Sequence, residues 1–246
     1  LASNSPSDMC ITLSLAILIP IYSFFILKGR LGLYNAGAVA AAYGSVSAVT
    51  FVSAANFLKS SQITFGGHMV AIMALMEAPA IIVAVILLRK YEKKKDSTSI
   101  SLKHLIGHSF TNGSVLMVLG SLIIGLVANS KQAEGIKPFT TDIFQGFLSI
   151  FLLEMGMVTA KRINGCLRYG KIIFLFAILV PLMNGCFVAF FSQFVTQDLG
   201  NRFMFSILAA SASYIAVPAS MRLAAPEADP GLYIPMALGI TFPFNI

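Results

Sequence analysis

The fold of this chain depends on the stretch Gly44-Ser45-Val46-Ser47-Ala48-Val49-Thr50-Phe51-Val52-Ser53-Ala54-Ala55-Asn56, which lies inside an apolar segment. Its glycine, hydroxyl side chains and valines are weak helix formers, so a membrane helix here is expected to be interrupted. A similar mixture of small residues, hydroxyl side chains and helix breakers occurs near the other end of the chain, in Ala209-Ala210-Ser211-Ala212-Ser213-Tyr214-Ile215-Ala216-Val217-Pro218-Ala219-Ser220. We expect the two stretches to face each other and to form a substrate site.

Composition places the chain in a membrane. Of its 246 residues, 57% are apolar and 11% are charged, and the mean hydropathy is +0.83. A soluble domain has about 25% charged residues. Apolar runs of about 17–25 residues can cross the hydrocarbon core, and they predict an all-α polytopic membrane protein. The eight predicted spans lie near 9–28, 35–57, 66–89, 112–128, 143–160, 172–195, 203–221 and 231–246, with the last one cut short.

The basic residues indicate the orientation of these spans. Of the 17 Lys and Arg residues, one set of alternate loops holds thirteen and the other set holds four, Lys59, Lys131, Lys137 and Arg202. Positive residues stay preferentially on the cytoplasmic side, so the first set is expected in the cytoplasm, in a plasma membrane or bacterial inner membrane. Topology therefore accounts for the net charge of +7, and no nucleic-acid partner is expected.

An internal repeat connects the two halves of the chain. Ala16-Ile17-Leu18-Ile19-Pro20 returns 161 positions later as Ala177-Ile178-Leu179-Val180-Pro181, and an offset of 164 superposes Ser47-Ala48 on Ser211-Ala212. The second and seventh spans are five apart, an odd number, so the two copies enter the membrane from opposite sides. Inverted repeats are typical of secondary transporters. The pattern predicts a 5+5 arrangement in the full protein, with two spans before residue 1 and further sequence after residue 246.

The predicted breaks suit a small anion. The second half of a broken helix begins with free N–H groups and the positive end of its dipole, so two such ends can hold an anion without a buried Lys or Arg. The alternative for either stretch alone is that its small residues only allow close helix packing, but the repeat favours a site. The candidate substrate-binding residues are Ser45, Ser47, Ala48, Thr50, Ser211, Ala212, Ser213 and Tyr214.

Glu77 is the candidate for a coupling ion. It lies in the middle of a predicted span, in Met76-Glu77-Ala78-Pro79, where an ionised carboxylate is costly and is usually functional or paired. We expect it to bind a sodium ion or a proton together with Ser47, Thr50 and Ser213. Three other polar residues within spans keep two interpretations each. Glu154 is either functional or paired near the basic end of its span, and Asn56 and Asn184 are either interhelical contacts or ligands.

The sequence contains no catalytic motif of the H-E-x-x-H, G-x-S-x-G or P-loop type, and its serine-rich stretches have no histidine base nearby. We therefore expect no enzymatic activity and no cofactor other than a possible sodium ion.

Six stretches combine into one pattern: Tyr43-Gly44-Ser45-Val46-Ser47, Met76-Glu77-Ala78-Pro79, Phe144-Gln145-Gly146-Phe147-Leu148-Ser149-Ile150, Met155-Gly156-Met157, Ala209-Ala210-Ser211-Ala212-Ser213 and Pro218-Ala219-Ser220-Met221-Arg222. In this combination the chain, from residue 9 to its end, resembles the sodium-dependent bicarbonate transporters first recognised in cyanobacteria, as a divergent member. The resemblance implies a homotrimeric ten-helix carrier with a mobile core domain and a gate domain. Bicarbonate would be held where the two broken helices meet and carried with sodium by an elevator-type movement.

The resemblance also implies a division of the chain. Residues 9–89 would be spans three to five of the first repeat, with the core domain mainly in 35–89, and 90–111 a basic cytoplasmic junction. The second repeat, 112–246, would hold gate helices in 112–160 and core helices in 203–246. Lys93 to Lys95 in the junction either anchor the end of a span or bind a PII-like cytoplasmic regulator, as in cyanobacterial members.

This chain departs from the family pattern within the site itself. Tyr214 stands where the family has an aspartate, Ala216 where it has a serine and Val217 where it has a glycine, and Ala48-Val49 replaces a Gly-Ser pair. The expected site is therefore more apolar, with one carboxylate fewer for a cation. Two alternatives follow: a transporter of another small carboxylate or inorganic anion, or a membrane sensor that binds a ligand without translocating it.

Overall fold

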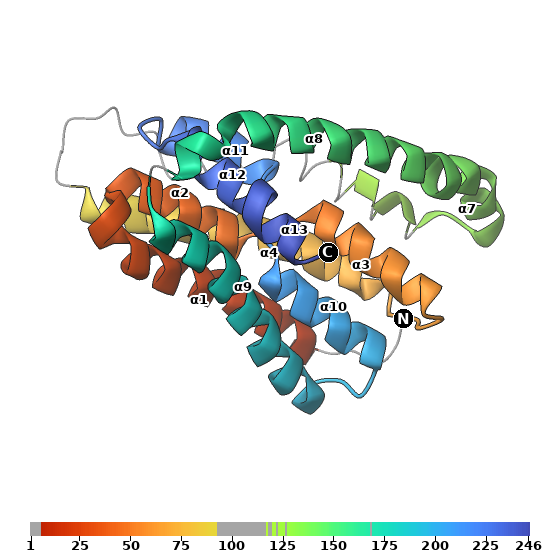
Figure 1. Cartoon of the computed structure of the whole chain (residues 1–246). Helices are drawn as coiled ribbons and strands as arrows, with labels where there is room; N and C mark the ends of the chain where they lie inside the picture. The colour runs from red at the N-terminus through yellow and green to blue at the C-terminus, as the bar shows by residue number, and fades with distance from the viewer. Residues whose placement is uncertain (1–5, 93–116, 118–119, 122, 126, 168) are drawn as a thin grey trace.

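The computed structural model is an assembly of helices (Figure 1). It describes residues 6–92, 117, 120–121, 123–125, 127–167 and 169–246, and this part of the chain contains no strand. Four helical segments in it are long and apolar enough to cross a membrane: Met9–Leu31, Leu33–Ser60, His68–Tyr91 and Lys171–Phe194. They agree with the spans predicted near 9–28, 35–57, 66–89 and 172–195. The chain is a helical membrane protein.

The second of these segments is interrupted. Helix α2 (Leu33–Gly44) ends and helix α3 (Ala48–Ser60) begins after three residues. Ser45 and Ser47 are both extended, with φ/ψ of −89/172° and −104/115°. Gly44 permits a close approach at this point, because a Cβ atom there would collide with the ring of Pro20 in helix α1 (Pro6–Leu31). The predicted break is thus present between residues 44 and 48.

A second interruption separates helix α10 (Leu199–Ala210) from helix α11 (Ala216–Ala224). Asp198 starts α10 by accepting a hydrogen bond from the N–H of Asn201 at 2.8 Å, a capping role that suits a short carboxylate. Ser211 is extended, with φ/ψ of −83/165°, and ends α10. The segment predicted near 203–221 is therefore two short helices around a break.

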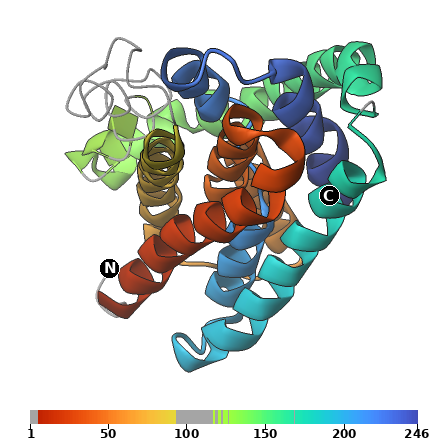
Figure 2. The same ribbon diagram turned by 90° about the vertical axis from the view of Figure 1, so that its left-hand side faces the viewer.

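Helices α1 and α9 (Lys171–Phe191) carry the two copies of the Ala-Ile-Leu-x-Pro pattern and lie on the same side of the molecule (Figures 1 and 2). Helix α1 packs on α2 and on α4 (His68–Tyr91), whereas α9 packs on α10. The Tyr22 hydroxyl on α1 donates to Asn184 Oδ1 on α9 at 2.7 Å. Asn184 therefore serves as an interhelical contact, one of the two roles expected for it.

The end of the chain packs against both interrupted helices. It consists of α12 (Pro230–Pro235), the π-helical turn η3 (Met236–Thr241) and α13 (Phe242–Phe244). The buried Thr241 hydroxyl donates to the Ala177 carbonyl at 2.7 Å, so the Tyr43 hydroxyl of α2, also at 2.7 Å, must be the donor to Thr241. The Asn245 side chain donates to the Ala210 carbonyl at 2.8 Å, immediately before the second break.

The remaining predicted spans are less simple. Helix α8 (Phe144–Leu167) continues from α7 (Ser130–Lys137) through a π-helical turn, η1 (Pro138–Ile143), so the helical stretch that contains the span predicted near 143–160 begins before that span. Pro230–Phe244 is a shorter apolar helix. The span predicted near 112–128 and the junction 90–111 lie mostly outside the described residues. The eight-span count, the inverted 5+5 repeat and the division into core and gate domains remain predictions.

Candidate functional site

The two helix breaks touch. The N–H of Ser47, in the first break, donates to the Ser211 hydroxyl oxygen, in the second break, at 3.1 Å. The Ser211 hydroxyl in turn donates to the Leu208 carbonyl at 2.9 Å. Ser47 and Ser211 are 4% and 2% exposed. The repeat offset of 164 therefore pairs two residues that are bonded to each other.

A second bond joins the second break to the end of α2. The N–H of Ser213 donates to the Ala42 carbonyl in the last turn of α2 at 2.7 Å. Irregular backbone survives at membrane depth only where protein or a cavity satisfies its polar groups. Here the second break supplies both partners: the Ser211 hydroxyl accepts from the N–H of Ser47, and the Ser213 N–H donates to the Ala42 carbonyl.

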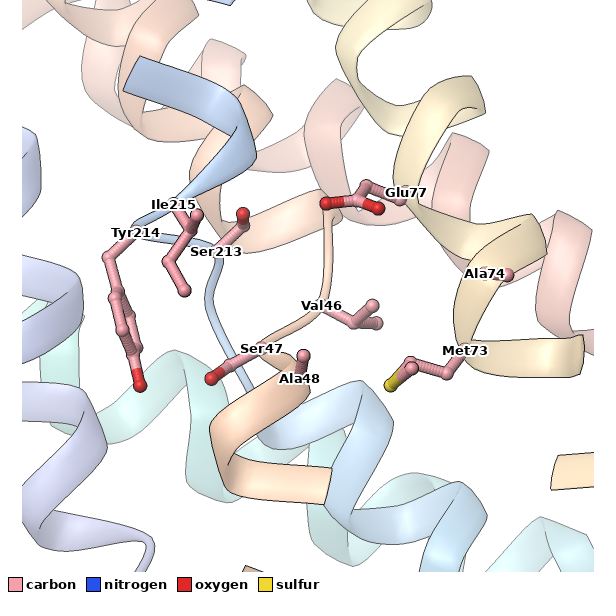
Figure 3. Close-up of a pocket in the computed structure, with 9 residues that line it drawn as sticks. All are labelled: Val46, Ser47, Ala48, Met73, Ala74, Glu77, Ser213, Tyr214 and Ile215. Carbon is pink, nitrogen blue, oxygen red and sulfur yellow. The ribbon is translucent and has the colours of Figure 1, made fainter. Parts of the chain in front are cut away.

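A cavity of about 50 Å³ lies against this crossing (Figure 3). A water-sized atom needs about 10–15 Å³ of such volume, so the cavity holds about three to five heavy atoms. Five predicted site residues line it, Ser47, Ala48, Glu77, Ser213 and Tyr214. The structure therefore gathers side chains from the two breaks and from α4 around one small space.

Four predicted residues support the crossing from outside the cavity wall: Ser45, Thr50, Ser211 and Ala212. The N–H of Thr50 donates to the Ser47 hydroxyl at 3.1 Å, which caps the start of α3. Ser45 is 1% exposed, and its hydroxyl has no hydrogen-bond partner in the described part of the chain. These residues shape the breaks rather than the wall of the space between them.

Four wall residues were not predicted from the sequence: Val46, Met73, Ala74 and Ile215. Met73 and Ala74 precede Glu77 by four and three positions in α4. Residues at these spacings share a helix face, so the position of Glu77 was a signal that both would line the same space. Val46 and Ile215 carry no such signal, because each lies in irregular backbone.

The electrostatics of the cavity depend on Glu77. Its carboxylate points toward Ser213 across the space in Figure 3, and none of the described residues that line the wall is a Lys, Arg or His. An ionised carboxylate in such a place needs a cation, a proton or hydrogen-bond donors. With Glu77 ionised the cavity carries a negative charge and repels an anion, whereas with Glu77 protonated or paired with a cation it does not.

Two helix N-termini contribute partial positive charge. Helix α3 begins at Ala48 in the cavity wall, and helix α11 begins at Ala216, directly after the wall residue Ile215. The first N–H groups of a helix and its dipole favour negative charge near the N-terminus. Anion-stabilising groups and one carboxylate thus lie at the same cavity, an arrangement suited to binding an anion and a cation together.

Tyr214 fills the position where the family aspartate was expected. Its side chain is 6% exposed, and its ring packs edge-on against Phe242 with the ring centroids 5.7 Å apart. Its hydroxyl lies close to that of Ser47 but makes no hydrogen bond of standard geometry. The phenol thus offers a buried hydroxyl at the edge of the cavity.

Glu154 and Asn56, two other polar candidates, lie away from the cavity. Glu154 is exposed on α8, and Asn56 is exposed on α3 two turns beyond the wall residue Ala48. Neither contributes to the wall.

A helical membrane protein in which two interrupted helices meet at a small cavity with a carboxylate and hydroxyl groups in its wall has the architecture of a secondary transporter. Comparison with protein families agrees with this class. The chain matches the model of the Na+-dependent bicarbonate transporter superfamily over residues 1–246 and belongs to that family. No curated protein matches the sequence.

Proposed function

We propose that this protein is a secondary active transporter that carries bicarbonate together with sodium. The observation that supports this function best is the cavity at the crossing of the two breaks, which combines Ser47, Ser213 and the N-terminus of α3 with Glu77. Its volume of about 50 Å³ suits the four heavy atoms of bicarbonate at about 10–15 Å³ for each water-sized atom.

Charge balance explains the coupling. A bicarbonate ion and an ionised Glu77 side by side repel each other in a space with little water. A sodium ion bound by Glu77, with oxygens of Ser47, Thr50 and Ser213 in reach of the crossing, removes that repulsion. Each ion then raises the affinity of the site for the other, which is the thermodynamic requirement of symport.

The proposal includes a movement and an assembly. In an elevator mechanism the two interrupted helices move as one core domain against the gate helices, and the bonds between the breaks are consistent with one rigid unit. We further propose a homotrimer in the plasma membrane, or the inner membrane of a bacterium, with the junction 90–111 as a candidate docking site for a PII-like regulator.

Uptake of labelled bicarbonate into proteoliposomes tests the function. With a sodium gradient directed inward, the expected result is accumulation above the level that potassium or choline supports. Uptake that does not depend on sodium would contradict the proposed coupling but support bicarbonate as the substrate. Absence of bicarbonate uptake under every gradient would contradict bicarbonate as the substrate.

One observation favours a second substrate. The cavity wall includes Val46, Met73 and Ile215 beside its hydroxyls, and Tyr214 replaces a charge expected from the family. Another small carboxylate would use the same polar groups and gain from the apolar ones.

A further inference from the structure

A second and larger chamber adjoins the candidate site. It has a volume of about 570 Å³, lies between α3, α4 and α8, and is open on one side, where its lining residues Met117, Phe147 and Ile215 are 71%, 60% and 46% exposed. Ala48, Met73 and Ile215 line both the cavity and the chamber. The two spaces are therefore neighbours that share a wall built from the N-terminus of α3, the middle of α4 and the second break.

The chamber is apolar nearly throughout. Of the described residues that line it, Ser121 alone is polar, and the others are aliphatic, methionine or phenylalanine side chains such as Val49, Val52, Leu148 and Phe151. Bicarbonate gains nothing from such a surface, because all its heavy atoms except one carbon are oxygens. The polar groups of the site and this apolar wall together match a molecule with a charged head and a hydrocarbon tail.

We propose that the site takes short unbranched monocarboxylates, with the carboxylate at Ser47 and Ser213 and the alkyl chain directed past Met73 into the chamber. This inference rests on the proposed function, since it uses the same anion-binding groups and the same cation at Glu77. The carboxylate head has three heavy atoms, which the cavity accommodates at about 10–15 Å³ each, and the chamber volume lies within the range of ~300–1,000 Å³ of ordinary ligand sites.

The apolar wall determines how affinity depends on chain length. Each methylene moved from water into an apolar surrounding raises affinity about fourfold. Along the series formate, acetate, propionate and butyrate, the first carbon beyond the head occupies the shared wall at Met73 and Ile215, and later carbons enter the chamber. Affinity is therefore expected to rise at each step, with a heat-capacity change of binding that becomes more negative as the chain lengthens.

Calorimetric titration of the purified, detergent-solubilised protein in sodium chloride tests the series. Binding is the right readout, because short carboxylic acids also cross bilayers unaided in their protonated form. The expected result is a dissociation constant that falls about fourfold for each added methylene. In addition, butyrate should inhibit labelled bicarbonate uptake more strongly than formate does.

Two variants of Val52 locate the alkyl chain. Val52 lines the chamber but not the cavity, so Val52→Phe should abolish the gain from acetate to butyrate while bicarbonate uptake persists. Val52→Ala, which removes volume and cannot obstruct folding by its size, should move the preferred chain length upward. Val127→Phe makes the same change at a residue that is 81% exposed and should leave the series unaltered.

The outcomes separate this inference from the proposed function. If the protein takes up bicarbonate but its affinity for carboxylates stays constant or falls with chain length, the inference is overturned and the proposed bicarbonate transport is still supported. A rising series that Val52→Phe abolishes, in a protein that does not take up bicarbonate, supports the inference and removes bicarbonate as substrate. A rising series that neither Val52 variant changes also overturns the inference, because the alkyl chain would then lie elsewhere.

Discussion

The backbone N–H of Ser47 donates a hydrogen bond of 3.1 Å to the hydroxyl of Ser211, 164 positions later in the chain. Both residues are extended and each belongs to a break in a helix. The donor would otherwise be a buried amide without a partner, so the second break stabilises the first. One side-chain hydroxyl therefore makes the direct bond between the two breaks.

Replacing Ser211 with alanine should destabilise the protein. The N–H of Ser47 would stay buried without an acceptor, at a cost of about 1–3 kcal/mol. Thermal unfolding in detergent should show a lower midpoint. Bicarbonate uptake should fall because the bond that holds the two breaks at a fixed separation is lost.

Ser60→Ala is the matched control for this variant. The Ser60 hydroxyl also donates to a carbonyl three residues back, that of Phe57 at 2.8 Å, but it is exposed. Its loss should cost less than about 0.5 kcal/mol. Equal midpoints for the two variants would show that the Ser47–Ser211 bond does not stabilise the crossing.

Gly44→Ala should also destabilise the protein, for steric reasons. The added methyl group would meet the Cγ and Cδ atoms of Pro20, with Ala80 Cβ at 3.2 Å on another side. Overpacking of this kind costs about 1–3 kcal/mol. Gly29→Ala is the control, because a Cβ there meets nothing within 4 Å and alanine favours the helix. A Gly44→Ala protein as stable as Gly29→Ala would mean that α1 and α2 can separate at this point without loss.

Glu77→Gln should uncouple transport from sodium while the protein stays folded. The amide keeps the shape of the side chain but removes the charge that attracts the cation. Loss of one partner of a buried charge pair costs about 2–5 kcal/mol, so the apparent sodium affinity should fall about 30-fold or more. Uptake measured over a range of sodium concentrations gives this affinity.

Glu154→Gln makes the same chemical change on α8, at an exposed position away from the cavity. Its sodium dependence should equal that of the unaltered protein. A Glu77→Gln protein with unchanged sodium dependence would assign Glu77 a structural role instead.

Tyr214→Phe separates binding from folding. The Tyr214 hydroxyl makes no hydrogen bond of standard geometry, and the ring keeps its packing against Phe242 in the variant. Stability should therefore change by less than about 0.5 kcal/mol. If the hydroxyl donates to the bound anion, its loss costs about 1.5–3 kcal/mol, and the half-saturating bicarbonate concentration should rise about tenfold or more. An unaltered half-saturating concentration would exclude Tyr214 from substrate binding.

Much of the architecture was predictable from composition and local chemistry. Long apolar runs identify membrane helices because their backbone groups must bond internally in lipid, and four such helices are present where they were expected. The breaks at Ser45 and Ser211 were predicted from weak helix formers inside apolar runs. The offset repeat indicated that these breaks would be partners, and their hydrogen bond fits that expectation.

Other features depend on tertiary contacts that a local pattern does not contain. The requirement for glycine at position 44 comes from Pro20, and the bond from the Ser213 N–H ends on Ala42 of another helix. Val46 and Ile215 line the cavity because of irregular backbone, whose side-chain directions follow no period. The continuation of α8 back to Ser130 was not predicted, because the residues of α7 are mostly polar and apolar runs do not indicate a helix there.

The bond from Asn245 to the Ala210 carbonyl has a consequence for biogenesis. When α10 stops at Ala210, that carbonyl loses its helical partner, and the amide that replaces it comes from 35 residues further along the chain. During synthesis, the second break cannot reach its final state until Asn245 has left the ribosome and α12, η3 and α13 have inserted. Completion of the crossing between the two breaks and arrival of this last segment are then a single late event.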